Sequence, residues 1–562
     1  MRYFMVLMLT LALLLFFITG CGKVNWQEKA DAFLAKYLDE YAKLELVYTT
    51  ISWKASNTGA AEDFAASATA EIDLRKLHSH PQRYKELTEI LAHAGELQPL
   101  TLRSLKVAEL AFKGNQLSPE MIEKLSKGAS DIQQTFNTFR GKIDGQEYSN
   151  NELLEMLAKS TNSAERQKTW EALKQTGEAV APKLIALAKV RNEAAVTLGF
   201  KNYWDMQVRL QEHDPDQLVA IFAELEKTTD EPFRQMKAKL DSEIAPKFKV
   251  KAEAMMPWHY DNPFFQDAPP SDKLNLDDFY KDKPKEEIIQ LAQKLYSDID
   301  LQTGDIVSRS DLYERPGKDQ HAFSTSIDRK GDCRILVNIK PTAEWMDTCL
   351  HELGHAVYSK YHDFTMPFNL RDAAHAFTTE GIAQLFGALS KNPTWIVAYA
   401  GIDPEKVKLA EGNILEQRRR EQLIFARWGL VMLNFEKALY ENPDQDLNKL
   451  WYDYVERFQL LTRPQDRNLA DWAAKPHFTI APVYYHNYIL GELFAAQLRA
   501  TLVKLANHQG PTFTMNYGAH KEFGDFLKKK VFEPGASYAW PEFVKNATGE
   551  PLTAQYFAGE LK

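Results

Sequence analysis

The chain has 562 residues, of which 44% are hydrophobic and 26% are charged, and its formal net charge is -9. This is the balance of a globular protein with ample material for a large core, and the modest negative charge without a basic cluster argues against a nucleic-acid partner. Length alone would suggest several domains, but the sequence has no Gly/Ser-rich or Pro-rich linker, no internal repeat and no low-complexity segment, so we expect one large unit.

The first 20 residues have the pattern of an export signal. Arg2 precedes an apolar run over 3–18 that is short for a membrane span, and the run leads into Ile18-Thr19-Gly20-Cys21. This ending resembles a bacterial lipobox, which predicts cleavage before Cys21 and lipidation of its thiol; the alternatives are a plain secretory signal or an N-terminal anchor. We therefore expect a signal peptide over 1–20, a single domain over 21–562, and a lipid anchor in the membrane of a bacterial cell envelope, on the periplasmic or outer-membrane side.

Helical periodicity dominates the rest of the chain. Apolar residues recur near a period of 3.6 over 26–56, and further helices are predicted over 152–157, 165–177, 180–198 and 215–244. The aromatic-rich stretch 255–265 is predicted to be a loop that packs over the core. One strand pair is predicted, over 322–327 and 333–339, and it leads directly into the next helix. The expected fold class is therefore mainly α, with one small antiparallel strand pair.

The helix after the strand pair carries the HExxH motif His351-Glu352-Leu353-Gly354-His355. Residues i and i+4 lie one turn apart on the same helix face, so the imidazoles of His351 and His355 can bind one metal ion. The carboxylate of Glu352 then lies beside the metal, where it can take a proton from a water molecule. The alternative is an ordinary buried helix with two hydrogen-bonded histidines, and a third ligand would decide between them.

The best candidate for the third ligand is Glu380, which lies 25 residues after His355 in a second apolar helical stretch. This spacing leaves room for a loop over 361–372 and for a second helix packed on the first. The sequence thus predicts a Zn²⁺ site formed by two histidines and a glutamate, with an open position for water. The alternative role for Glu380 is that of a carboxylate favoured by the helix macrodipole.

These motifs resemble those of the angiotensin-converting enzyme family, which are zinc dipeptidyl carboxypeptidases. The resemblance is densest over 331–355 and 370–380, and Arg427-Trp428-Gly429, the Lys475/His477 segment and 540–561 occur in matching order. It implies a large helical ellipsoid with a deep central channel, a zinc ion deep inside, and N-terminal helices that act as a lid.

The resemblance also implies substrate contacts ahead of and after the metal helix. His321 and Ala322 match a substrate-binding pair, where an edge strand offers backbone N–H and C=O groups to an extended peptide. Lys475 matches a lysine that holds the C-terminal carboxylate of the substrate, and His477 matches a histidine that steadies the transition state. A surface lysine is the alternative for Lys475.

Two family tyrosines have three candidates, because the register slips by about one residue. We favour Tyr488 for stabilising the oxyanion and Tyr485 for binding the carboxylate, with Tyr484 as the competitor and core packing as the alternative for each.

Several positions depart from the family pattern. Gln384 stands where the family has an aspartate one turn after the zinc glutamate, a position suited to a hydrogen-bond partner of a ligand histidine. Gln320 and Asn338 replace a disulfide of animal members, and Val455 and Asn487 fall near chloride-binding arginines, which puts chloride activation in doubt.

The sequence therefore predicts a zinc-dependent peptidase that hydrolyses oligopeptides near the C-terminus and releases dipeptides. Zinc would lower the pKa of its water to roughly 7, Glu352 would take the proton and pass it to the leaving amine, and His477 with Tyr488 would stabilise the oxyanion. The alternatives are a zinc oligopeptidase or monocarboxypeptidase, and an inactive peptide-binding lipoprotein. The presence of all three ligands and of Glu352 argues against the inactive protein.

Overall fold

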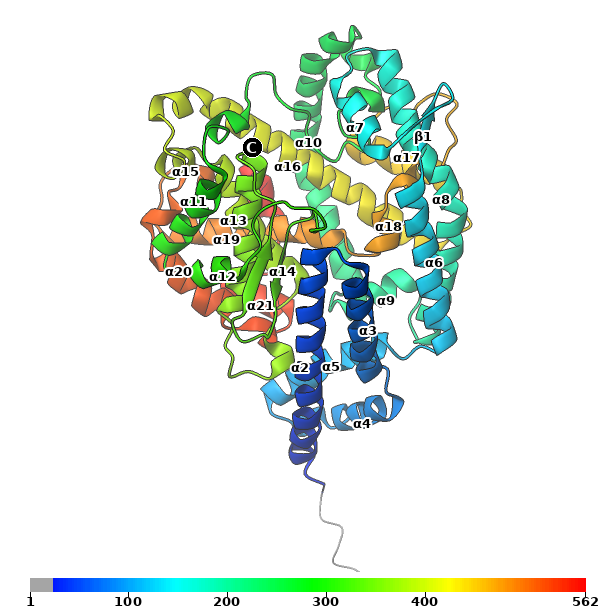
Figure 1. The fold of residues 1–562 in the computed structure, drawn as a ribbon, viewed down its shortest axis with the longest axis vertical. Helices are drawn as coiled ribbons and strands as arrows, with labels where there is room; N and C mark the ends of the chain where they lie inside the picture. The colour runs from blue at the N-terminus through cyan, green and yellow to red at the C-terminus, as the bar shows by residue number, and fades with distance from the viewer. Residues whose placement is uncertain (1–23, 562) are drawn as a thin grey trace, which may run out of the picture.

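The structure of the protein is a computed structural model that describes residues 24–561 (Figure 1), so the expected signal peptide and Cys21 lie outside the described residues. Helices account for most of the fold. In the first half of the chain they are α2 (Trp26–Thr58), α3 (Ala61–His78), α4 (Pro81–Leu91), α5 (Pro99–Gly114), α6 (Pro119–Thr138), α7 (Asn150–Lys159), α8 (Ser163–Thr197), α9 (Tyr203–Leu210) and α10 (Pro215–Ile244).

In the second half they are α11 (Lys285–Asp298), α12 (Gly304–Arg309), α13 (Ala343–Lys360), α14 (Ala376–Gly387), α15 (Pro393–Ala398), α16 (Pro404–Glu441), α17 (Leu447–Tyr454), α18 (His477–Ile480), α19 (His486–Leu505), α20 (Glu522–Leu527), α21 (Trp540–Thr548) and α22 (Gln555–Glu560). Among residues 24–561, none of these helices combines the length and the apolar character needed to cross a membrane.

The mainly α fold class is confirmed, and the helices predicted over 26–56 and 215–244 correspond to α2 and α10. The two helices predicted over 165–177 and 180–198 form one helix, α8, which continues through Pro182. A proline inside a helix removes a backbone hydrogen bond. Here buried neighbours such as Val180 and Leu184 pack into the main core, and this packing offsets the loss.

The expected strand pair is present as β3 (Phe323–Ser326) and β4 (Cys333–Leu336), antiparallel with Phe323 opposite Leu336. The described residues hold one further hairpin that the sequence analysis did not predict, β1 (Gly141–Ile143) and β2 (Gln146–Tyr148). Asp144 and Gly145 form its turn with φ values of 52° and 88°, the positive angles that tight hairpins require. Strands of three residues are too short to show an alternating pattern, so only this turn gave a signal.

The large hydrophobic core draws residues from Ile132 to Leu561, whereas α2, α3, α4 and α5 share a smaller core of their own. In Figure 1 the helices α13, α14 and α19 lie on one side, α6 and α8 lie on the other, and the long helix α16 runs between them. Helix α2 packs against α3 and α5, and its C-terminal part reaches the region of the strand pair.

Candidate metal centre

The predicted ligands lie on two helices that pack closely. His351 and His355 are in the middle of α13, which begins where the Thr342 hydroxyl accepts a hydrogen bond of 3.2 Å from the Trp345 N–H. Glu380 is in α14. The helices can approach because residue 354 is glycine: a Cβ atom there would lie 2.9 Å from the Ala383 Cα. A larger residue at this position of the motif would push the two histidines away from the glutamate.

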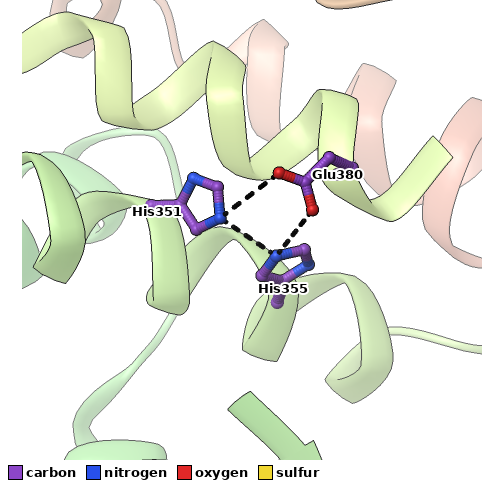
Figure 2. Close-up of side chains that lie close together, drawn as sticks. All are labelled: His351, His355 and Glu380. Carbon is purple, nitrogen blue, oxygen red and sulfur yellow. Dashed lines mark hydrogen bonds and ion pairs between the residues drawn. The ribbon is translucent and has the colours of Figure 1, made fainter. Parts of the chain in front are cut away.

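The three side chains converge on one point (Figure 2). The two Nε2 atoms of His351 and His355 are 3.2 Å apart, and each lies 3.7 Å from a different oxygen of the Glu380 carboxylate. Ligands that sit about 2.0–2.1 Å from a tetrahedral zinc ion lie roughly 3.3 Å from one another. The two imidazoles and the carboxylate therefore fit a zinc ion in donor type and in spacing, and they form a cluster whose ligand atoms all lie within 4.8 Å.

His355 is held in the orientation that a metal needs. Its Nδ1 lies 2.7 Å from the Thr379 hydroxyl, and when Nδ1–H donates to this oxygen, the lone pair of Nε2 faces Glu380. Burial, together with the neighbouring His351, keeps the pKa of His355 well below its usual range, so the ring is neutral. Thr379 was not predicted, because a threonine beside a candidate ligand has no distinctive sequence pattern.

Glu352 is close to the ligands without being one of them. It is 7% exposed and lines the same cavity as His351, His355 and Glu380. Burial raises the pKa of its carboxyl to about 7, with His351 lowering and Glu380 raising the value. A carboxylate with such a pKa can both accept and return a proton near neutral pH.

Three neighbouring cavities in this part of the molecule share lining residues. The first, of about 540 Å³, contains all three metal-ligand candidates and Glu352. The second, of about 380 Å³, shares His351 with the first, and the third, of about 580 Å³, shares Gln266 with the second. The metal centre therefore lies where the first two cavities meet, and Gln266 marks the boundary between the second and third.

The strand β3 forms one wall of the first cavity. In the part of the chain that the structure describes, it pairs with β4 alone, and residues 322–326 line the cavity with the metal-ligand candidates. Ala322 thus lies in the wall of the cavity that holds the metal-ligand candidates. His321 lines the third cavity instead, and its side chain is 95% exposed, so the structure does not bring this imidazole to the metal centre.

Lys475 is buried at 5% exposure and is not a surface lysine. Its Nζ donates to the Gln266 Oε1 and lies 5.7 Å from the ring centroid of Tyr485. The Tyr485 Oη accepts a hydrogen bond of 2.7 Å from the Trp428 Nε1, which leaves its own O–H free to donate. Lys475, Gln266 and Tyr485 thus form a cluster of donors, which we call the lysine cluster. Gln266 was not predicted, because it follows the aromatic-rich stretch 255–265 without a motif of its own and lies 209 residues from Lys475 in the sequence.

The remaining predicted residues divide between the two regions. Tyr488 lines the first cavity beside Tyr484, and burial raises its pKa, so its O–H stays protonated and can donate. His477 packs against Tyr485, with ring centroids 5.2 Å apart, and its buried Nδ1 has no hydrogen-bond partner among the described residues. Burial and then Lys475 lower the pKa of His477 to about 4. His477 therefore lies with the lysine cluster, whereas Tyr488 lies with the metal centre.

Gln384 does not hydrogen-bond to a ligand histidine. Its Nε2 donates instead to the Glu380 Oε1 at 3.4 Å and to the Tyr488 backbone oxygen at 3.2 Å. The glutamine therefore orients the carboxylate of the candidate ligand, a role that an aspartate could not have because it lacks a donor.

Helix α2 contributes Glu45 and Thr49 to the wall of the first cavity. Glu45 of this helix forms an ion pair of 2.6 Å with Arg329 in the turn between β3 and β4, and Arg329 also lies 3.2 Å from Asp372. The Thr49 hydroxyl donates to the Ile327 backbone oxygen at 2.7 Å. These contacts fasten α2 over the strand that faces the metal centre.

Two histidines one turn apart, a glutamate from the next helix and a free carboxylate beside them define the ligand set of HExxH metallohydrolases, here in a mainly α fold. The chain belongs to the angiotensin-converting enzyme family, whose model matches residues 24–260 and 269–557.

Individual relatives match over part of the chain. The angiotensin-converting enzyme of Mesocricetus auratus is 26% identical over 241 residues, which cover 42% of this chain and 18% of the relative. Those of Mus musculus and Oryctolagus cuniculus are each 25% identical, over 234 and 236 residues, which cover 41% of this chain and 18% of the relative. The aligned segment thus spans less than a fifth of these relatives.

Proposed function

We propose that the protein is a zinc-dependent peptidase of the angiotensin-converting enzyme kind that removes dipeptides from the free C-termini of oligopeptides. The observation that carries this proposal is the row of cavities, with the metal centre at one boundary and the lysine cluster at the next. Membership of the family supports the hydrolytic activity. The lysine cluster supports action on a chain end.

The residues of the first cavity fit this reaction. A zinc ion held by His351, His355 and Glu380 would polarise a water molecule and lower its pKa to roughly 7. Glu352, beside the ligands, takes the proton from the attacking water and passes it to the leaving amine. Tyr488 donates its O–H to the oxyanion that develops on the scissile carbonyl, and the free edge of β3 binds the extended backbone of the peptide.

The lysine cluster would hold the end of the substrate. A charge-assisted hydrogen bond contributes roughly 1.5–3 kcal/mol, and the Lys475 ammonium can form one with the C-terminal carboxylate of a peptide. Gln266, Tyr485 and His477 add neutral donors around the same point. The C-terminal carboxylate would be held where the second and third cavities meet, and the peptide bond would be hydrolysed where the first and second meet. The separation of these two points would then set the length of the released peptide.

Digestion of a matched pair of peptides tests this proposal. The two peptides have the same sequence of about ten residues, one with a free C-terminus and one with an amide, and the purified zinc-loaded protein is mixed with each before mass spectrometry. We expect dipeptides from the free peptide, and a loss of about 10-fold to 150-fold in kcat/KM on amidation. In Lys475→Met the loss of kcat/KM on amidation should be smaller, because the ammonium that binds the carboxylate has been removed.

The alternatives give other products. Equal cleavage of both peptides at internal bonds would identify a zinc oligopeptidase, and release of single residues would identify a monocarboxypeptidase. Binding of the peptide without any cleavage would identify the inactive peptide-binding lipoprotein. Each of these results contradicts the dipeptide proposal.

We also propose that the enzyme is anchored to the membrane of a bacterial cell envelope by lipid on Cys21, on the periplasmic or outer-membrane side. The support is the lipobox-like Ile18-Thr19-Gly20-Cys21 after an apolar run. A fractionation experiment on Cys21→Ser is described below.

A further inference from the structure

The third cavity contains a second buried lysine that the mechanism above does not use. Lys174 belongs to α8 and is 3% exposed, and its Nζ lies 3.2 Å from the ring centroid of Phe264. Among residues 24–561, no acceptor forms a hydrogen bond with this Nζ and no carboxylate forms an ion pair with it. An ammonium taken out of water without such a partner is costly.

The carboxylate that acts on the pKa of Lys174, that of Asp471, is already engaged by other donors. Asp471 accepts hydrogen bonds of 2.7 Å from both Nε and Nη2 of Arg467, and it accepts another from the Tyr452 hydroxyl. Burial lowers the pKa of Lys174 well below its usual range, even though Asp471 opposes this shift. An anion that enters the cavity would restore the charged form of this lysine.

Lys174 shares one cavity with Lys475 and Gln266 of the lysine cluster. Its wall includes Lys174, Lys475 and Gln266, and the ring of Phe264 lies 3.2 Å from one ammonium and 5.4 Å from the other. The Thr176 hydroxyl also lines it, buried and without a hydrogen-bond partner in the described part of the chain. The cavity therefore presents two polar groups that lack partners, next to the point where the substrate's C-terminus is proposed to bind.

We propose that Lys174 binds a second carboxylate of the substrate, the side chain of a C-terminal aspartate or glutamate. This inference rests on the proposed function, in which Lys475 holds the α-carboxylate of the same residue. An acidic residue at a peptide's end carries two carboxylates a few bonds apart, and the two lysines on either side of Phe264 match that pair in charge. The enzyme would then prefer peptides that end in an acidic residue.

The test compares peptides that end in Glu with peptides that end in Gln, which has the same shape and no charge. For the wild type we expect kcat/KM to be at least about 10-fold higher for the Glu peptide, the lower end for a charge-assisted bond. In Lys174→Met the ratio should fall to about one, and in Lys174→Arg, which keeps a cation, it should stay above one. Lys189→Met is the matched control, because Lys189 is an exposed residue of the same helix that pairs with Asp444; it should keep the wild-type ratio.

The outcomes separate this inference from the proposed function. Dipeptide release from both peptides at equal kcat/KM by the wild type would overturn the role of Lys174 and leave the exopeptidase intact. Failure to cleave either peptide would overturn both. Tripeptide release that becomes dipeptide release in Lys174→Met would show that Lys174 binds the α-carboxylate instead. A chloride-dependent rate that disappears in Lys174→Met, without any preference for Glu, would show an inorganic-anion site.

Discussion

Lys475 predicts an alkaline limit on the cleavage of peptides with a free C-terminus. Burial lowers the pKa of Lys475 to about 8, and the nearby Asp267 opposes this shift. Because the pKa lies below the usual value for lysine, the ammonium loses its charge earlier as the pH rises. The free enzyme should therefore bind the substrate carboxylate fully below about pH 7 and progressively less above about pH 8.

The expected size follows from the fraction of charged Lys475. Above a pKa of about 8, each further pH unit leaves about one-tenth as much ammonium, so kcat/KM at pH 9 should be roughly 10-fold below its plateau. The assay is a pH profile of kcat/KM, which reports groups of the free enzyme. The same profile with the amidated peptide is the control, since ionisation at the metal centre affects both peptides equally.

Two results would refute this reasoning. An identical alkaline decline for free and amidated peptides would assign the decline to another group, such as the water at the metal centre. Retention of the decline in Lys475→Arg would do the same, because a guanidinium stays charged over the whole range.

Four further substitutions test separate parts of the molecule. Glu352→Gln should lower kcat by roughly 100-fold to 10,000-fold while zinc content, measured by mass spectrometry of the metal, stays near one per chain; loss of zinc would make Glu352 a ligand. Tyr488→Phe should lower kcat by about 100-fold to 1000-fold with little change in KM, and an unchanged kcat would exclude it from the oxyanion site. Arg329→Met leaves Glu45 unpaired at a contact where both side chains are 13% exposed. The free energy of local opening of α2, measured by amide hydrogen exchange, should therefore fall by up to roughly 3–5 kcal/mol. Unchanged exchange would contradict the fastening of this helix. Cys21→Ser should shift the protein out of the membrane fraction, whereas unchanged size and extraction would indicate a simple N-terminal helix anchor.

The metal centre could be predicted from the sequence because it depends on local rules. The i, i+4 spacing of His351 and His355 fixes their common face once the segment is helical, and α13 is a continuous helix from Ala343 to Lys360. The prediction of Glu380 needed one further assumption, namely that the loop after α13 brings the next helix back against the two histidines. The close contact at Gly354 makes that return possible, although the sequence alone did not reveal it.

The parts that escaped prediction depend on tertiary contacts. Gln266 meets Lys475 across 209 residues, and no periodicity or motif links the two. Helix α8 was predicted as two helices that break after Gly177, whereas the structure has one continuous helix through Gly177 and Pro182; its buried residues Val180 and Leu184 belong to the main core, a tertiary contact that local propensity does not report. The hydrogen bonds of Gln384 were assigned to the wrong partner, since the choice between a histidine and Glu380 depends on side-chain placement.

The loop that carries Gln266 coincides with a break in the family match. The matched ranges end at residue 260 and resume at 269, and the segment between them contains Phe264, Gln266 and Asp267, which lie around Lys475. This loop is fixed in place, because the Gln459 Nε2 donates to the backbone oxygens of Phe264 and Phe265 at 3.0 and 2.8 Å. The ligands and Glu352 lie within the matched ranges. We therefore expect this chain to share its hydrolytic chemistry with its relatives and to differ from them in its preference for the substrate's C-terminal residue.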